Sequence, residues 1–211
     1  MAEERIDSAG REERITYTPL SNSELAAVVT YLEMRAPPAQ DVPASPLSLK
    51  RIKSPDPDAY RALFRLVGAP WLWFSRLVID DPKLAAIIRH PAVELDAVVD
   101  ERGRDVGMLE LDFREAGQCE LSFIGLIPEL SGKGHGRWLL AEAVRRAWGR
   151  DAVARVHVHT CSLDHPAALA AYRRAGFTPY RRTIERFPDP RLLGVLPKDC
   201  APQIPLLGTD A

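Results

Sequence analysis

Features that would indicate a membrane, a secreted framework or a nucleic-acid partner are scarce in this sequence. No apolar run approaches the roughly 18 residues that cross a bilayer, and the charged start, M-A-E-E-R-I-D, lacks the apolar segment of a signal peptide. Only 3 cysteines occur, at no framework spacing, so we expect a cytoplasmic protein. A net charge of −1 provides no basic field for nucleic acid. We therefore expect a soluble globular protein with neither a membrane nor a nucleic acid as its partner.

The chain has 211 residues, enough for one domain with a sizeable core. Its 18 prolines cluster in two stretches that we expect to be irregular, 37–57 and 188–205. The expected parts are a disordered charged tail (1–14), a single domain (15–187) with a loop-and-helix region (36–90) and a core (93–187), and a proline-rich C-terminal tail (188–211). This last tail packs either on the domain or on a partner.

Hydrophobic periodicity predicts strands and helices in a mixed order. The expected strands are 28–35, 93–99, 106–114, 120–127, 154–160 and 178–187, after a proline-rich loop over 36–55. The expected helices are 57–67, 137–149 and 166–175, with short segments at 71–79 and 83–89. Asp56 or Asp58 can cap the first helix, and Asp164 or His165 the last. Because helix 137–149 is a crossover, its two flanking strands should be parallel in an otherwise antiparallel sheet.

Residues 119–140, C-E-L-S-F-I-G-L-I-P-E-L-S-G-K-G-H-G-R-W-L-L, combine a strand, a glycine-rich turn and the start of a helix. Gly132, Gly134 and Gly136 stand at every second position. Such a turn lets backbone N–H groups approach an anion, and the helix N-terminus adds a partial positive charge. The pattern predicts a phosphate or pyrophosphate site.

Spacing narrows the kind of phosphate loop. G-x-x-x-x-G-K-S/T is excluded because Gly134 follows Lys133, and G-x-G-x-x-G because Arg137 stands at its third glycine. The stretch resembles the acetyl-CoA loop of the GNAT superfamily of N-acetyltransferases, Q/R-x-x-G-x-G/A, with Gly134 and Gly136 at the small positions. Ser131 stands where Gln or Arg is usual, so the resemblance implies a grip through backbone N–H groups, Lys133 and Arg137.

A second motif lies about 40 residues downstream, in H-P-A-A-L-A-A-Y-R-R-A-G-F. It resembles the N-x-x-A-x-x-x-Y-x-x-x-G-F signature of the same superfamily. Ala168, Tyr172, Gly176 and Phe177 fall on the matching positions, and His165 stands where Asn is common. The two motifs occur in the order that the superfamily has, so the chain is identified as a member of it.

The resemblance covers roughly residues 93–187 and implies the acyl-CoA N-acyltransferase fold. This is an α/β (α+β) architecture with a mixed, mostly antiparallel, splayed sheet of about six to seven strands flanked by helices. Strands 120–127 and 154–160 would part at their C-terminal ends, with acetyl-CoA in the opening. Region 36–90 would flank the acceptor side.

The resemblance also implies the donor site. Pantetheine would borrow hydrogen bonds from the strand before the turn, and the pyrophosphate would lie on the turn. The implied residues are Phe123, Ile124, Gly125, Leu126, Ile127, Ser131, Gly132, Lys133, Gly134, His135, Gly136, Arg137, His165 and Ala168. Gly125, in mid-strand, fits a bulge or a close backbone approach. No metal is expected.

Transfer to an amine needs two proton movements. An alkyl ammonium with a pKa of roughly 10 is neutral about one time in a thousand at pH 7, a penalty of about 4 kcal/mol that a base can relieve. Glu120 is the expected base, with Glu110 and Asp112 on one face of the neighbouring strand as an acidic pair suited to a cationic amine. Tyr172 is the expected acid, because its position in the motif implies a hydroxyl near the thioester sulfur.

Other side chains have two interpretations each. One group of side chains has a spacing that metal ligands can have: His157, His159, Cys161 and His165. The same segment is also explained as a strand beside the cofactor followed by the start of a helix. His157 or His159 could instead be the base. Trp71, Trp73 and Phe74 are either core packing or a wall of the acceptor pocket.

The leading functional hypothesis is an acetyl-CoA-dependent N-acetyltransferase acting on a small primary amine. The first alternative is a non-catalytic acyl-CoA sensor on the same fold, favoured by Ser131 and His165. The second is transfer to a protein N-terminus or lysine, for which an open groove beside Tyr172 would be diagnostic. The final strand and proline-rich tail favour a homodimer.

Overall fold

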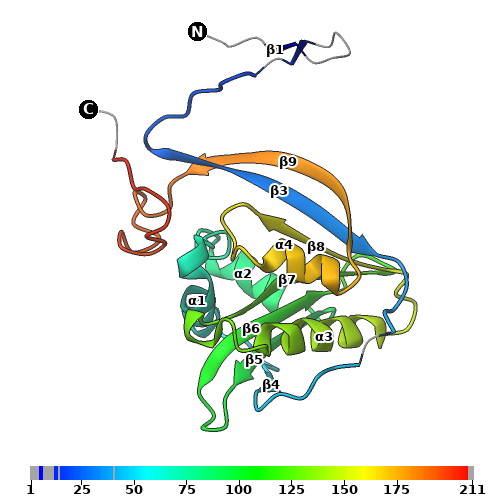
Figure 1. Cartoon of the computed structure of the whole chain (residues 1–211). Helices are drawn as coiled ribbons and strands as arrows, with labels where there is room; N and C mark the ends of the chain where they lie inside the picture. Colours follow the sequence, from blue (N-terminus) through cyan, green and yellow to red (C-terminus); the bar gives the residue numbers. More distant parts are fainter. Residues whose placement is uncertain (1–4, 7–11, 14, 40, 209–211) are drawn as a thin grey trace.

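The structure is a computed structural model that describes residues 5–6, 12–13, 15–39 and 41–208. The disorder expected for 1–14 concerns positions that mostly lie outside these ranges. The described part of that segment contains two short strands, β1 (Arg5–Ile6) and β2 (Glu12–Glu13), which pair antiparallel. Everything that follows concerns the body after residue 15 (Figure 1).

The body contains one seven-stranded sheet in the order β4-β5-β6-β7-β8-β3-β9. Its strands are β3 (Glu24–Met34), β4 (Ser48–Arg51), β5 (Val93–Val99), β6 (Asp105–Asp112), β7 (Gln118–Leu126), β8 (Arg155–Cys161) and β9 (Thr178–Pro188). All neighbours are antiparallel except β7 and β8, which are parallel. The expected mixed, mostly antiparallel sheet is confirmed.

Helices cover both faces of this sheet. They are α1 (Pro57–Gly68), α2 (Asp81–Ile88), α3 (His135–Trp148) and α4 (Ala168–Arg174), with 3-10 turns η1 (Ala69–Trp71) and η2 (Pro128–Leu130). One core lies under α3 and α4, another under α1 and α2. None of the helices in the described ranges combines the length and the apolar character needed to cross a membrane.

The start of α1 follows from its sequence. Asp56 caps the helix by accepting hydrogen bonds from the N–H groups of Asp58 and Ala59, and Pro57 stands at the first position. The apolar stripe predicted for this helix is buried in the core. The segment expected at 71–79 is not helical beyond η1; Leu72 takes a left-handed φ of 56°, and the chain runs on in turns.

Two corrections concern strands. The loop expected over 36–55 contains β4, four residues that pair with β5 and that have no alternation of their own. The first long strand begins four residues earlier than expected and lies between β8 and β9. Figure 1 shows β3 and β9 as a long ribbon arching over the rest of the body.

The cap expected for the last helix is also corrected. Helix α4 begins at Ala168, without a side-chain cap, rather than at 166. Asp164 turns back instead and accepts hydrogen bonds from the Thr160 hydroxyl (2.7 Å) and the Cys161 N–H (2.8 Å) at the end of β8. His165 accepts the Ala167 N–H through Nδ1 and so shapes the turn.

The C-terminal segment 189–205 packs on the domain. Its centre is the Arg191 guanidinium, which is 1% exposed and donates to both carboxylate oxygens of Asp189 and to the Ile204 carbonyl (2.9 Å). Leu196 and Ala201 of this segment are buried against Leu72 and form a third small core. The segment, which we name the C-terminal strap, therefore belongs to the fold.

Candidate active site

Strands β7 and β8 part after three residue pairs. The parallel register joins Gln118–Glu120 with Arg155–His157 and then ends, whereas β7 stays paired with β6 as far as Leu126. The predicted splaying is confirmed. From Leu121 onward the edge of β7 that faces β8 has no ladder partner, so its backbone groups are available to a ligand.

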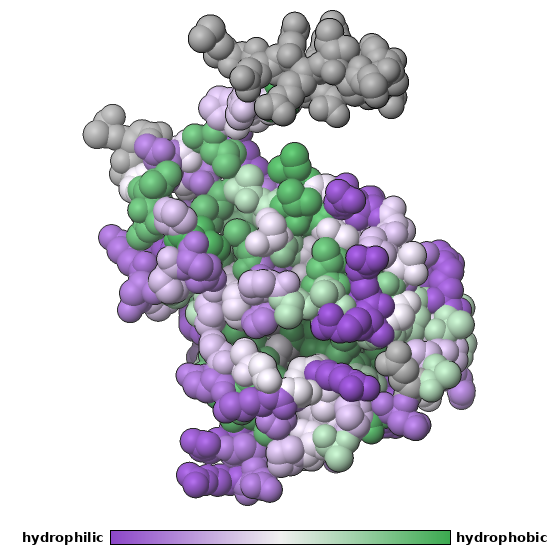
Figure 2. Space-filling view, viewed as in Figure 1, coloured by the Kyte–Doolittle hydropathy of each residue, from purple (hydrophilic) through white to green (hydrophobic). Residues whose placement is uncertain are grey.

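A cavity of about 1400 Å³ fills the opening between the two strands. Side chains of α3, such as Leu140, line it on one side of the sheet, and Val67 and Phe74 line it on the other. The cavity therefore passes through the sheet where the strands separate. Figure 2 shows the hollow in the face between α4 and α3, with apolar residues inside.

Most of the strand residues expected at the donor site line the cavity: Phe123, Ile124, Gly125 and Leu126 do, and Ile127 does not. A Cβ on Gly125 would stand 2.7 Å from Val67 Cγ1, so the position is closely packed by a side chain of α1. The bulge lies elsewhere, at Ser122, because Glu110 pairs with Phe123 and Leu111 with Leu121.

The glycine-rich turn leads from η2 into α3. Gly132 and Gly134 take φ of +76° and +83°, in the left-handed region that favours glycine. Gly136 is within the first turn of α3, and a Cβ there would meet no atom within 4 Å. The helix begins with no side-chain cap. The Arg137 N–H donates to the Gly134 carbonyl at 3.1 Å, and the first N–H groups of a helix otherwise have no partner within it.

The cavity wall contains part of the expected turn. Ser131, Gly132, Gly134, Gly136 and Arg137 line it. Lys133 and His135 are not part of the wall. The chemistry of this end is therefore that of a helix N-terminus with one guanidinium, which suits a phosphate or pyrophosphate. We name it the donor end.

Tyr172 lies in α4, and its ring is 9% exposed and lines the cavity. The ring packs edge-on against Phe177, with centroids 5.9 Å apart. Burial raises the pKa of the Tyr172 hydroxyl, and the Asp164 carboxylate adds to the shift. Among the described residues the hydroxyl has no hydrogen-bond partner. A phenol in this state stays protonated at neutral pH.

Glu120 and His159 meet at the point where the strands separate. The Glu120 Oε1 and His159 Nδ1 atoms are 3.4 Å apart, and both side chains line the cavity. The hydrogen bond from His159 lowers the pKa of Glu120, and the Glu120 carboxylate raises the pKa of His159. His157, one turn of the pleat earlier, has its pKa lowered by burial.

Of the acidic pair expected at the acceptor channel, Asp112 lines the cavity and Glu110 does not, and each carboxylate is paired with an arginine. Glu110 is fully buried and accepts hydrogen bonds from the Tyr60 hydroxyl (2.6 Å) and Arg76 (2.7 Å). Asp112 pairs with Arg114 at 2.6 Å. Neither carboxylate is free for a cationic ligand.

The aromatic run after η1 forms a wall. Trp71, Trp73 and Phe74 all line the cavity. The Trp73 indole donates to Asp164 at 3.0 Å, and Trp71 packs edge-on against the His165 ring at 5.0 Å. Ala168 and His165 line the cavity on the α4 side. Both interpretations of these aromatics therefore apply in part: all three line the cavity, and Trp73 and Phe74 also pack against the core.

The histidines and cysteine of β8 share one face, as the alternation predicts. Within the described ranges, no group of three or more His, Cys, Asp or Glu side chains could hold a metal ion. Burial raises the pKa of the Cys161 thiol to about 11, so it is not a thiolate at neutral pH. The donors near the cavity are N–H, guanidinium and hydroxyl groups, which bind anions and carbonyls.

A sheet that splays at a glycine-rich helix start, with a cavity passing through it, defines the acyl-CoA N-acyltransferase fold. The model of the Acetyltransferase (GNAT) family matches residues 60–177, more than half of the chain. The chain belongs to the GNAT acetyltransferase family. A search among curated proteins found no match.

Solved structures with this fold share little sequence with the chain. A GCN5-related N-acetyltransferase from Sphaerobacter thermophilus superposes with a TM-score of 0.57 at 21% identity, over 77% of this chain and 52% of that one. A GCN5-related N-acetyltransferase from Kribbella flavida superposes with a TM-score of 0.52 at 16% identity, over 82% of this chain and 63% of that one. The spermidine/spermine N-acetyltransferase SpeG from Vibrio cholerae gives 0.51 at 18%, over 72% and 98%. The chain thus spans about half the length of the Sphaerobacter protein, and these similarities concern the fold alone.

Proposed function

We propose that the protein is an acetyl-CoA-dependent N-acetyltransferase that acts on a primary amine of a small molecule. The observation that carries this proposal is the single cavity lined by the glycine turn, Tyr172 and Glu120 together. One opening can therefore receive a phosphorylated donor from the α3 side and an amine from the α1 side.

The residues present fit acetyl-CoA. The open space over Gly132, Gly134 and Gly136 is a volume that a Cβ would occupy, and the uncapped start of α3 supplies N–H donors. Arg137 lines the same wall. The buried Ser122 hydroxyl, at the bulge and in the cavity wall, has no partner in the described chain. These groups would hold the cofactor, whose thioester supplies the acetyl group.

Two protons must leave the nitrogen of an ammonium for an amide to form. Glu120 and His159 stand where the first can be taken up, and the raised pKa of His159 lets the pair hold it. The departing sulfur, whose thiol has a pKa of about 8.5, accepts the proton that Tyr172 holds. The second proton from nitrogen restores the Tyr172 hydroxyl, so the proton balance closes.

A small acceptor is favoured by what covers the cavity. Phe74 packs against Phe187 with ring centroids 5.1 Å apart, and the C-terminal strap lies behind Phe74. We infer that this cover of the α1-side end favours a small acceptor over an extended protein segment.

The test combines binding and turnover on the full chain. Thermal shift with acetyl-CoA reports donor binding, and release of free thiol in the presence of a panel of primary amines reports transfer. We expect a shift and amine-dependent release. Binding without release on any amine would instead support an acyl-CoA sensor.

A further inference from the structure

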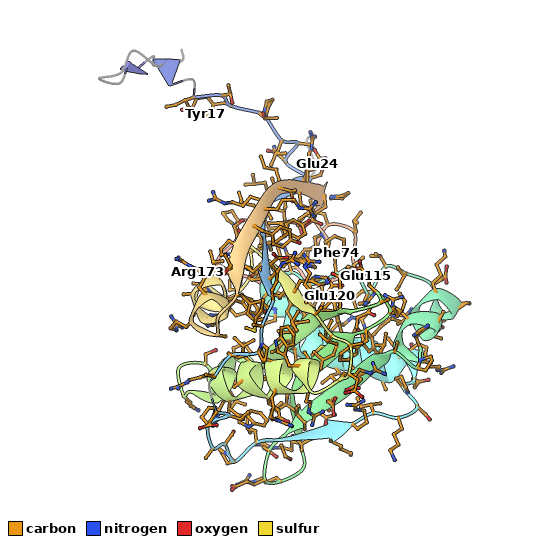
Figure 3. All side chains as sticks on the ribbon, turned by 90° about the vertical axis from the view of Figure 1, so that its right-hand side faces the viewer. Tyr17, Glu24, Phe74, Glu115, Glu120 and Arg173 are labelled. Atoms are coloured by element: carbon orange, nitrogen blue, oxygen red, sulfur yellow. The ribbon has the colours of Figure 1, made fainter. Side chains whose placement is uncertain are left out.

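The end of the cavity opposite the glycine turn is built from four separate segments. We name it the acceptor end and define it by Phe74, Arg76, Glu120, His159, Glu185 and Phe187, which all line the cavity. Figure 3 shows Phe74 and Glu120 on the opposite side of the β3–β9 ribbon from Arg173 of α4. The acceptor end therefore lies on the α1 side of the sheet.

The positive charges at this end are already paired. Arg76 donates to Glu110, and Arg114, beside it in the wall, pairs with Asp112. A guanidinium held by a buried carboxylate has little attraction left for an anionic ligand. The Arg76 Nε–H is buried without a partner among the described residues, but the charge of its guanidinium is already matched by Glu110. The arginines described at the acceptor end therefore offer an incoming anion no unmatched positive charge.

The negative charges are not all paired. Asp164 is satisfied by Trp73, Thr160 and a backbone N–H. Glu120, in contrast, has no arginine or lysine as an ion-pair partner among the described residues; its charge interacts with His159, at 3.4 Å, and with His157. Glu185 of β9 is exposed and has no ion pair or hydrogen bond with any described residue. These two carboxylates give the acceptor end a net attraction for a cation.

The rest of the acceptor end is apolar. Phe187 is 9% exposed and Val29 of β3 is 4% exposed. Phe187 contacts Phe74, and the strap, held by Arg191, fixes Phe74 through the small core that contains Leu196. Val29 and Phe187 lie outside residues 60–177, whereas Phe74 lies inside them, so the β3 and β9 part of this apolar wall does not belong to the segment that the family model matches.

We propose that the acceptor is a primary amine with one positive charge, an apolar and preferably flat body, and no anionic group. The inference rests on the proposed transferase function. Its nitrogen lies toward Glu120 and His159, and its body lies against Phe74 and Phe187, because aromatic rings bury flat apolar surfaces well. Glu185 attracts the cation at the mouth of the cavity. An added carboxylate on the acceptor would meet Glu120 or Glu185 and be repelled.

The experiment compares four amines on the full chain by thiol release: phenethylamine, ethanolamine, spermidine and phenylalanine. Phenethylamine and phenylalanine share the same body and differ in the carboxylate. We expect kcat/KM for phenethylamine to exceed that for each of the others by tenfold or more. A preference for ethanolamine, spermidine or phenylalanine overturns this assignment but leaves the transferase intact. Acetyl-CoA binding without thiol release on any amine overturns the proposed function and this assignment with it.

Variants add a second readout. Phe187→Leu should raise KM for phenethylamine at least fivefold and leave the Kd for acetyl-CoA unchanged, since it alters only the acceptor end. Tyr180→Ala, on the same strand but outside the cavity wall, is the matched control and should change neither. Glu185→Lys should lower kcat/KM for phenethylamine about tenfold at low salt. If KM is unchanged in Phe187→Leu and kcat/KM is unchanged in Glu185→Lys, the assignment is contradicted.

Discussion

The Trp73 indole donates a hydrogen bond of 3.0 Å to the Asp164 carboxylate, across the opening between β7 and β8. The Trp73 ring packs against Phe123 of β7, 5.3 Å between centroids. Asp164 in turn holds the end of β8 through Thr160 and Cys161. The Trp73 side chain thus packs against β7 and donates to Asp164, which holds the end of β8. Together these contacts fix the width of the cavity.

Replacing Trp73 with Phe should keep most of the packing and remove this bond. A hydrogen bond to a charged group contributes about 1.5–3 kcal/mol, so we expect a loss of about 1.5 kcal/mol in the free energy of unfolding, measured in urea. Trp148→Phe is the control, because that indole donates to the weak acceptor Met34 Sδ. Equal losses in both variants would show that size alone, and not the bond to Asp164, matters.

Gly136→Ala separates donor binding from folding. The position is helical, has no neighbour within 4 Å of an added Cβ, and should gain about 0.5 kcal/mol from the better helix former. The methyl group would occupy the space expected for the pyrophosphate, so the Kd for acetyl-CoA should rise tenfold or more in calorimetry. Gly134→Ala, at a φ of +83°, should in contrast lower the free energy of unfolding in addition to weakening acetyl-CoA binding. Unchanged binding by Gly136→Ala would place the phosphates elsewhere.

Local sequence patterns predicted the elements that carry local signals. The glycine turn, the A-x-x-x-Y-x-x-x-G-F helix and the alternating β8 segment are confirmed, because backbone preference and periodicity act within a few residues. β4 could not be predicted because its four residues become a strand only through pairing with β5, and even the closest pair, Arg51 with Asp96, is 45 positions apart in the sequence. Its environment, not its sequence, determines its structure.

Features of the site that depend on contacts distant in sequence could not be predicted. The Glu120–His159 contact joins two strands, and the neutralisation of Glu110 depends on Arg76 and Tyr60, both from other elements. Neither pattern is periodic or contiguous. The sequence did not decide whether the strap packs on the domain or on a partner. Arg191, the residue around which the strap folds, lies in a proline-rich stretch without periodicity and so is not marked by any local pattern.

The Glu120–His159 pair should be visible in a titration. The folded-state pKa of Glu120 lies below its usual value of about 4.3. Its contribution to the stability of the fold is therefore fully present above about pH 4.3 and is lost as the pH falls through the folded-state pKa. The folded-state pKa of His159 lies above its usual value of about 6.5, so its contribution to stability is fully present below about pH 6.5 and is lost as the pH rises through the folded-state pKa. The attraction is thus complete between about pH 4.3 and 6.5.

Glu120→Gln removes the carboxylate and leaves burial as the remaining influence on His159. We expect the pKa of His159, followed by its ring proton resonances in NMR, to fall in this variant. The pKa of His157, on which burial acts more strongly than the Glu120 carboxylate, should change less than that of His159. A His159 pKa that is the same in both proteins would contradict the pairing.

Arg191→Met tests whether the strap is folded around its guanidinium. The substitution removes the charged partner of the buried Asp189 carboxylate and leaves it only the backbone N–H of residue 191, which costs about 3 kcal/mol. Amides of 190–205 should exchange with solvent faster, while those of the central strands keep their protection. Arg182→Met, at an exposed position of β9, should leave the exchange pattern unchanged. Unaltered exchange in the strap of Arg191→Met would show that its apolar contacts suffice.

The central claim is that the buried Tyr172 hydroxyl supplies the proton for transfer within this cavity, and single-site kinetics of Tyr172→Phe test it most directly. The hydroxyl has no partner in the described chain, so the melting temperature and the Kd for acetyl-CoA should stay at their wild-type values. General acid catalysis contributes about 10²–10⁴-fold, so kcat for amine-dependent thiol release should fall at least 100-fold. A Tyr172→Phe protein that binds acetyl-CoA and keeps its full kcat would contradict the account.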